Sequence, residues 1–297
     1  MKNLTLFAIA ASALPFASAN SNRSSKYWFS FGDSYTTTGF NVTGVQPSPS
    51  NPFGNPAYPG VNTCGTDSPT WINYVATKFN SSLVQVYNHA YSGATVDAAI
   101  VSYGIPEIRS LKQQTDDFLA FDAPGKQYYP GWKSSNSLFS FWIGINDINI
   151  SYTRNGSYTE FDKVLLNRYF ELVQSIYNVG ARDFLFLTIP PVERTPFMLT
   201  TPVANRTLEH EVIADYNQQL LRKVSSFAAS HRDVTVKVYD TRPIFNAVLD
   251  HPSNYGIVDA VSYGNGSDVA WCNEYHPSSA FHFQIAKEVA KLIKKYI

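Results

Sequence analysis

The sequence predicts an α/β fold, a three-layer sandwich in which helices cover a parallel five-stranded sheet. Five short runs rich in apolar, β-branched and aromatic residues recur along the chain, and segments that read as helices separate them. Several of these runs are apolar at consecutive positions, which is typical of strands covered on both faces. Regular alternation of strand and helix indicates a parallel sheet wrapped by helices.

Strands are expected at 27–31, 83–87, 138–143, 184–189 and 234–239, and helices at 71–79, 161–179, 208–230 and 280–296. The first helix follows Ser-Pro-Thr, the second ends before Gly180, and the last carries lysines toward its C-terminus, where the helix dipole favours cations. The segment 41–70 is rich in Pro, Gly, Asn and Ser. Its length predicts either a wall of a functional site or a flexible surface loop.

The first residues of the chain differ in composition from the rest. Residues 1–19 combine Lys2, an apolar centre and small residues at Ala17 and Ala19, which is the pattern of a secretory signal peptide. No later apolar run is long enough to span a bilayer. No linker divides residues 20–297, so we expect them to form one domain of a secreted monomer.

Charge and cysteine content narrow the function classes. Lys and Arg number 23, as do Asp and Glu, which argues against nucleic acid as a partner. Cys64 and Cys272 favour one disulfide, with two unpaired buried thiols as the alternative. Sequons of the form Asn-x-Ser/Thr predict a glycoprotein. Their asparagines are Asn22, Asn41, Asn80, Asn149, Asn155, Asn205 and Asn265.

Polar motifs follow three of the expected strands. Gly-Asp-Ser ends the first strand at Ser34, "NHAYSGAT" with Gly93 follows the second, and Gly-Ile-Asn-Asp with Asn146 follows the third. Any one of these motifs alone is more commonly a turn or a helix cap. Because parallel sheets bind ligands at the carboxyl ends of their strands, we expect all three to converge on one crevice.

The residue types in these motifs suit acyl transfer. Serine becomes a good nucleophile when a neighbouring base takes its proton, and His276, just before the last helix, is the candidate base for Ser34. The N–H of Ser34 at an expected helix start, the N–H of Gly93 and the amide of Asn146 could hold the developing oxyanion. His210 and Glu211 lack the second histidine of a zinc-binding His-Glu-x-x-His helix, so we expect no metal or cofactor.

Taken in order, these blocks resemble the four signature blocks of the GDSL, or SGNH, hydrolase superfamily. The stretch "HPSNYGI" is similar to a Pro-x-x-Tyr-Gly segment of many eukaryotic members. The resemblance implies a flavodoxin-like sheet, Ser34 as nucleophile, His276 as base, and an oxyanion hole made by Ser34, Gly93 and Asn146.

Within that superfamily, "SPTWINYVATKF" and "FWIGIND" resemble segments of the fungal acetylesterases of carbohydrate esterase family sixteen. Those enzymes remove acetyl groups from sugar hydroxyls of hemicellulose fragments, which implies a small-molecule or oligosaccharide acetyl ester as substrate. Two alternatives stay open. One is a lipase-like or phospholipase-like ester hydrolase, and the other is a weakly active homologue that binds carbohydrate.

The chain departs from the family pattern at Asn273, where members usually carry an Asp three residues before the catalytic His. An Asn carbonyl can orient a histidine but supplies no negative charge. The alternatives are another carboxylate, from Asp240, Asp268 or Glu274, or a backbone carbonyl and a Ser/His dyad. We favour a neutral partner.

Three further expectations concern the neighbours of these blocks. Asp33 lies beside Ser34 and suits local turn bonding better than a role behind the imidazole. Among the nearby aromatic residues, Tyr35 and Trp271 are expected to reach the pocket. A Cys64–Cys272 disulfide would tie the loop of His276 to the pocket wall.

Overall fold

The computed structural model describes residues 26–297, and its centre is a parallel sheet of five strands in the order β2-β1-β3-β4-β5. The strands are β1 (Lys26–Gly32), β2 (Val84–Asn88), β3 (Ser137–Trp142), β4 (Asp183–Leu187) and β5 (Thr235–Tyr239). The predicted fold class and all five predicted strands are confirmed. The expected signal peptide, residues 1–19, and the sequon at Asn22 lie outside the described residues.

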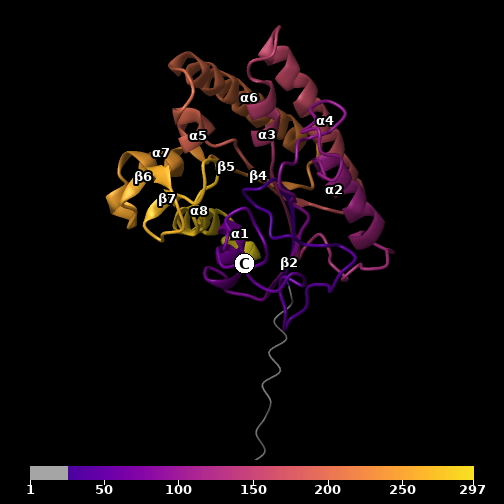
Figure 1. The fold of residues 1–297 in the computed structure, drawn as a ribbon. Helices are drawn as coiled ribbons and strands as arrows, with labels where there is room; N and C mark the ends of the chain where they lie inside the picture. The colour runs from indigo at the N-terminus through magenta and orange to yellow at the C-terminus, as the bar shows by residue number, and fades with distance from the viewer. Residues whose placement is uncertain (1–25) are drawn as a thin grey trace, which may run out of the picture.

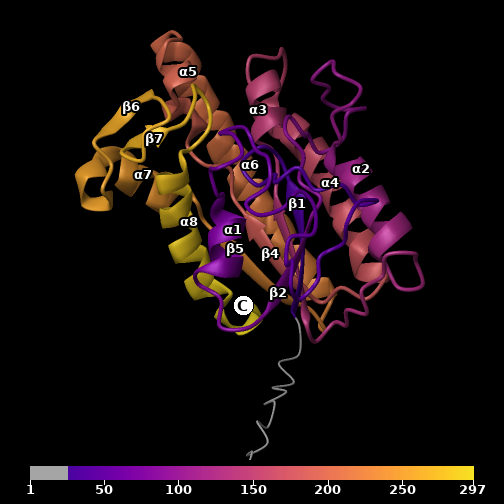
Figure 2. The same ribbon diagram turned by 60° about the horizontal axis from the view of Figure 1, so that its bottom comes forward.

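Helices cover both faces of the sheet, as Figures 1 and 2 show. On one face α1 (Trp71–Thr77) packs against α8 (Ser279–Leu292), and on the other lie α2 (Leu111–Asp117), α4 (Tyr158–Asn178) and α6 (Val203–Ser230). The four predicted helices correspond to α1, α4, α6 and α8. No helix within residues 26–297 has the length and apolar character to cross a membrane.

Strands β2, β3 and β4 are buried along their whole length, and β2 is buried although it is an edge strand and carries Gln85 and Asn88. Phenylalanine rings stack across the neighbouring strands β1, β3 and β4: Phe31 on Phe141 at 5.0 Å, and Phe141 on Phe186 at 5.5 Å between ring centroids. This aromatic packing helps to set where the carboxyl ends of these strands lie. It thereby helps to position the loops that follow them.

Several short elements were not predicted from the sequence. They include the helices α2, α3 (Ile145–Ser151), α5 (Pro196–Leu199) and α7 (Arg242–Asp250), and a two-stranded sheet of β6 (Asp259–Tyr263) and β7 (Val269–Trp271). A π-helix at Phe118–Asp122 and 3-10 turns at Val192–Arg194, Pro252–Tyr255 and Lys294–Tyr296 complete the list. The β6-β7 sheet lies beside the main sheet, next to α7 and α5 (Figure 1).

The long segment 41–70 is bound to the body of the protein. The N–H of Val86 donates to the carbonyl of Pro52 at 2.8 Å, the N–H of Val61 donates to the carbonyl of Thr38 at 2.9 Å, and the Phe53 side chain is buried. A disulfide between Cys64 and Cys272 ties its end to the loop after β7. These contacts favour the wall interpretation of this segment over the flexible loop.

Candidate active site

Ser34 stands on a tight turn at the carboxyl end of β1. The carbonyl of Asp33 accepts hydrogen bonds from the N–H groups of Thr36 and Thr37 at 3.1 and 3.0 Å, and its carboxylate accepts from the N–H of Tyr35 at 3.0 Å. The chain makes one turn there and no helix, so the expected helix start was wrong. Asp33 bonds locally, as expected, and is fully buried.

A glycine is required just before this turn. Gly32 pairs with Trp142 at the end of β3, and a Cβ at residue 32 would lie 2.5 Å from the Trp142 carbonyl oxygen. That oxygen belongs to the backbone of a buried strand and cannot move aside. The side chain of Ser34 is therefore placed by close contact between β1 and β3.

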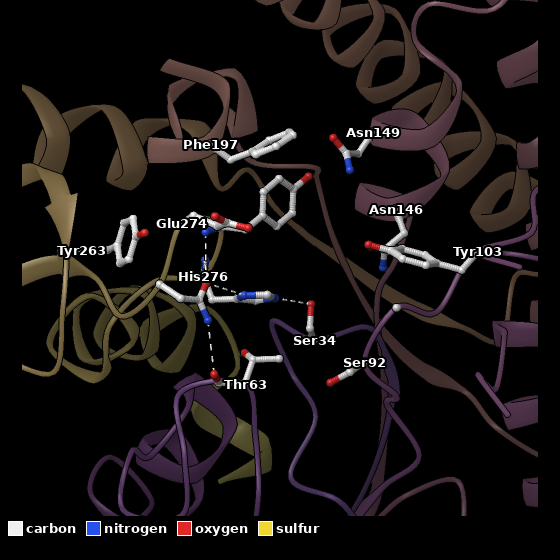
Figure 3. Close-up of a pocket in the computed structure, with 13 residues that line it drawn as sticks. Ser34, Thr63, Ser92, Tyr103, Asn146, Asn149, Phe197, Tyr263, Glu274 and His276 are labelled. Atoms are coloured by element: carbon white, nitrogen blue, oxygen red, sulfur yellow. Dashed lines mark hydrogen bonds between the residues drawn. The ribbon is translucent and has the colours of Figure 1, made fainter. Parts of the chain in front are cut away.

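His276 lies in the loop before α8 and meets Ser34 directly. Its Nε2 is 2.8 Å from Ser34 Oγ, and its Nδ1 is 2.8 Å from Asn273 Oδ1 (Figure 3). Asn273 Oδ1 also accepts the N–H groups of Tyr275 and His276, while Asn273 Nδ2 donates to the Thr63 carbonyl at 3.2 Å. These four contacts fix which way the amide faces.

The orientation of the Asn273 amide determines the tautomer of the histidine. Since Oδ1 can only accept, Nδ1 of His276 must carry the proton, which leaves Nε2 free to accept the hydroxyl proton of Ser34. The same amide donates to Thr63, which a carboxylate at residue 273 could not do. Asparagine thus orients the imidazole and holds the pocket wall at once.

No carboxylate among the described residues contacts His276. Asp240 is paired with Arg242 at 2.7 Å, and Asp268 and Glu274 have exposed side chains, with Glu274 on the cavity wall. Burial without a compensating charge lowers the pKa of His276 from 6.5 to about 4. The geometry therefore matches the neutral-partner alternative.

Two further residues predicted for the site, Gly93 and Asn146, line the same cavity as Ser34. Gly93 adopts φ +79°, and a Cβ there would lie 2.7 Å from the side chain of Ile108, so both backbone and space call for glycine. Asn146, near the start of α3, donates one amide hydrogen to the carbonyl of Ala94 at 2.8 Å. Its second amide hydrogen is available to a ligand.

Buried contacts hold the helix that carries Asn146 in place. Gly144, with φ +119°, precedes its first residue as the N-cap, and both carboxylate oxygens of Asp147 lie 3.1 Å from the N–H of Val96. Burial raises the pKa of Asp147 to about 7 and that of Asp33 to about 8. These carboxyl groups support the loops of the site from inside the protein.

Ser34, Gly93, Asn146 and His276 line one cavity of about 640 Å³. Figure 3 shows Ser34 between His276 on one side and Asn146 on the other. The remaining lining residues are Thr63, Ser92, Tyr103, Asn149, Phe197, Tyr263, Asn273, Glu274 and Tyr275. The arrangement combines an activated hydroxyl, a base and amide donors, which are the groups that attack on an ester carbonyl requires.

Comparisons with known proteins agree with this chemistry. The family model described as "GDSL-like Lipase/Acylhydrolase" matches residues 29–289. The chain belongs to this family. It is a carboxylic ester hydrolase, and the predicted superfamily is confirmed.

Two relatives of this GDSL hydrolase are named acetylesterase. The one from Thermothelomyces thermophilus is 38% identical over 270 residues, covering 90% of this chain and 88% of that protein. The one from Hypocrea jecorina is 25% identical over 323 residues, with the same shares of 90% and 88%. The structure of an acetyl xylan esterase variant from Geobacillus stearothermophilus has a TM-score of 0.52 at 16% identity, covering 92% and 96% of the two chains, and so shares the fold.

The disulfide expected in this GDSL hydrolase is present. Cys64 and Cys272 are bonded, with their Cα atoms 5.6 Å apart. The N–H of Cys272 donates to the His276 carbonyl at 2.9 Å, so the bond holds the histidine loop as well as segment 41–70. Its position agrees with the predicted link between loop and wall.

The aromatic residues expected in the pocket of the hydrolase were the wrong ones. Tyr35 and Trp271 are fully buried and absent from the cavity lining. The Tyr35 hydroxyl donates to the Tyr275 carbonyl at 2.7 Å and so supports the histidine loop from behind, whereas Trp271 Nε1 donates to the Ala260 carbonyl of β6 at 3.0 Å.

Other aromatic rings line the cavity. Tyr103, Phe197 and Tyr263 come from three separate segments, and Tyr275 lies next to His276. No motif marks the first three, because their segments approach the site only through tertiary packing. Tyr275 alone could have been found from the sequence, by its place in the "CNEYHP" block.

Proposed function

We propose that this GDSL hydrolase is an acetylesterase that removes acetyl groups from carbohydrate hydroxyls, such as those of acetylated xylo-oligosaccharides. The observation that carries the proposal is the hydrogen-bonded chain from Ser34 through His276 to Asn273, which opens into a cavity beside two amide donors. The two relatives named acetylesterase support the choice of acyl group.

The reaction proceeds in two halves. His276 Nε2 takes the proton of Ser34 as Oγ attacks the acetyl carbonyl carbon, and the C=O electrons move to the oxygen. The N–H groups of Ser34 and Gly93 and the free amide hydrogen of Asn146 bind that oxyanion. The tetrahedral intermediate collapses, the C–O bond to the sugar breaks, and the alcohol leaves with the proton from His276.

Water then completes the cycle. It loses a proton to His276 as it attacks the acetyl carbon on Ser34, and the released Ser34 oxygen regains that proton when acetate departs. Asn273 Oδ1 accepts the hydrogen bond from Nδ1–H throughout and keeps the imidazole in one orientation. Because Asn273 is neutral, the imidazolium formed in each half is stabilised by this hydrogen bond without a counter-charge.

The walls of the cavity favour a sugar as the alcohol part. Tyr103, Phe197 and Tyr263 are 47%, 41% and 55% exposed, so their rings are free to cover an apolar sugar face. The chain has no net charge, which suits an uncharged substrate. A lipase-like activity is the second candidate, because Phe197 and the 64% exposed Val261 belong to neighbouring elements, α5 and β6, and add apolar surface to this side of the protein.

The test uses p-nitrophenyl esters and two proteins. Wild type should hydrolyse the acetate, and Ser34→Ala should lose at least about a thousandfold in kcat/KM. Equal rates in the two proteins would refute the esterase and favour the weakly active carbohydrate-binding homologue. A series of acetate, butyrate and octanoate esters decides between acetylesterase and lipase: an optimum at octanoate would overturn the acetyl preference.

We also propose that the enzyme is a secreted, monomeric, single-domain glycoprotein. Support comes from the disulfide and from the exposed positions of the sequon asparagines Asn41, Asn155 and Asn265, whereas Asn80 and Asn205 are half-buried. Expression from the full gene in a fungal host should yield a protein in the medium that starts at residue 20 and loses mass on endoglycosidase treatment. Retention of residues 1–19 in that protein would contradict the proposal.

A further inference from the structure

We propose that Asn149 is a substrate-binding residue that holds a hydroxyl of the sugar and that it stays free of glycan in the active enzyme. The inference rests on the proposed function of the site and goes beyond it by naming the group that recognises the alcohol part. Asn149 opens an Asn-Ile-Ser sequon, so the sequence alone marks it for modification.

The position of Asn149 follows from the helix that carries Asn146. The two asparagines are three residues apart on α3 and therefore lie on the same face of that helix. Both line the cavity that contains Ser34. Figure 3 shows Asn149 above Asn146, facing the open space beside Phe197.

The side-chain amide of Asn149 has no hydrogen-bond partner in the described part of the chain, residues 26–297. Asn146, by contrast, is held by the Ala94 carbonyl, and Ser151 bonds back to the Asp147 carbonyl at 2.7 Å. Asn149 is half-buried, so it loses part of its access to water without gaining a partner in return. A ligand hydroxyl would satisfy its donors and its acceptor together.

The surroundings of Asn149 match a sugar better than a plain alcohol. Phe197 is anchored to the histidine loop, since its N–H donates to the Glu274 carbonyl at 2.8 Å, and its ring is 41% exposed. A pyranose could place its apolar face on this ring and a hydroxyl on Asn149. Pockets that combine apolar walls with a few placed polar groups gain their specificity from those polar groups.

A glycan on Asn149 would conflict with this role. The modification replaces an amide hydrogen with a bulky oligosaccharide. Attached to a residue of the cavity wall, it would compete with the substrate for the space next to Ser34. This sets Asn149 apart from the other described sequons, whose asparagines are absent from the cavity lining.

The first test compares two acetyl esters of ring alcohols of similar size, methyl 3-O-acetyl-β-D-xylopyranoside and cyclohexyl acetate. The second ester has no hydroxyl for Asn149 to bind. In Asn149→Ala the ratio of kcat/KM for the sugar ester to that for cyclohexyl acetate should fall about tenfold, the worth of one hydrogen bond, mainly through KM. Asn149→Asp keeps the size of the side chain and removes its donors, so it should lower the ratio as well.

Asn205→Ala is the matched control, because it removes a half-buried sequon asparagine on α6 that does not line the cavity. It should leave the ratio unchanged. An unchanged ratio in both Asn149 variants would overturn the inference while leaving the esterase intact. If wild type cleaves neither ester, the proposed function itself fails.

The second test is glycopeptide mapping of active protein secreted from a fungal host. The peptide with Asn149 should be unmodified, and Ser151→Ala, which destroys the sequon and keeps the amide, should retain full activity. A glycan found on Asn149 in the active fraction, or a gain of activity in Ser151→Ala, would refute the claim that Asn149 stays free.

Discussion

Ser34, Gly93 and Asn146 follow three neighbouring strands of the central sheet, whereas His276 lies in a loop held by links to distant segments. The first group, the sheet side of the cavity, is positioned by strand pairing such as Gly32 opposite Trp142. The second, the loop side, depends on single contacts: the disulfide, the Asn273 amide on Thr63, and the Phe197 N–H on the Glu274 carbonyl.

The difference shows how one site can combine a rigid part, the sheet side, with a part whose residues can change, the loop side. The sheet side is shared with the core, so any change there disturbs packing that holds the whole fold together. The loop side is modular, since each link can be altered without changing the packing of the core. It is also the side on which the chain departs from the family pattern, at Asn273.

Of the variants in this comparison, Gly32→Ala should have the largest effect on activity, because it breaks the sheet side. The new Cβ meets the backbone oxygen of Trp142 at 2.5 Å, and β1 must shift away from β3. We expect a loss of about 2–3 kcal/mol in the free energy of unfolding and about a hundredfold in kcat/KM, since Ser34 moves with the strand. Urea denaturation and ester hydrolysis measure the two effects.

Gly264→Ala is the control for this substitution. No atom lies within 4 Å of a Cβ at residue 264, so its stability should change by less than about 0.5 kcal/mol. A Gly32→Ala protein as stable and active as this control would show that the sheet does not set the position of Ser34.

The double variant Cys64→Ala/Cys272→Ala breaks the loop side. It should lose about 2–4 kcal/mol of stability and lower activity about tenfold at a temperature where the fold is retained, because His276 loses its covalent anchor. Circular dichroism and kcat/KM on the same sample separate the two losses. If activity falls only in proportion to the folded fraction, the disulfide stabilises the fold without positioning the histidine.

Asn273→Asp sharpens the comparison by adding the missing charge. His276 must be neutral to act as base, and burial lowers its pKa to about 4, so wild type should stay active down to about that pH. A carboxylate beside Nδ1 favours the imidazolium, and the acidic limb of kcat/KM should move upward by about one unit or more.

Asn205→Asp, outside the cavity lining, should leave the acidic limb in place. A wild-type limb near 6.5, or a limb that does not move in Asn273→Asp, would contradict the neutral-partner interpretation. The substitution also removes the Nδ2 donor to Thr63, so a small loss of stability should accompany the shift.

The sequence predicted the sheet side of the site better than the loop side. Apolar runs indicate strands, and the carboxyl ends of parallel strands lie at the same edge of the sheet. Ser34, Gly93 and Asn146, which follow three such strands, could therefore be placed together from the sequence. The aromatic lining could not, because Tyr103, Phe197 and Tyr263 reach the cavity through packing that no local pattern encodes. Tyr35 and Trp271 were wrongly predicted to reach the pocket, because closeness in sequence to Ser34 and His276 does not show whether a ring points into the cavity or into the core.

Buried carboxyl groups behind the sheet side give the smallest predicted effect. Burial raises the pKa of Asp162 to about 8, and both of its carboxylate oxygens are buried without a partner among the described residues. Glu209 behaves alike, with a pKa raised by burial to about 8. The folded state therefore keeps protons that the unfolded chain releases near pH 4, so stability is fully present below about 4 and is lost as the pH rises to about 8.

Two histidines, His276 and His282, act in the opposite direction, and their pH window ends at a lower pH than that of the carboxyls. Burial lowers the pKa of His276 to about 4 and that of His282 to about 3, so their contribution is lost as the pH falls below 6.5. Between pH 6.5 and 8 the contribution of these two histidines no longer changes, and the buried carboxyls should make Tm fall as the pH rises. Asp162→Asn should flatten the slope of the free energy of unfolding against pH by about 1.4 kcal/mol per pH unit, and the slope of Tm with it, whereas Asp116→Asn, at an exposed carboxylate, should not. A wild-type Tm that rises from pH 6.5 to 8 would show that these carboxyls are ionised in the folded protein and that the support behind the sheet side is charged.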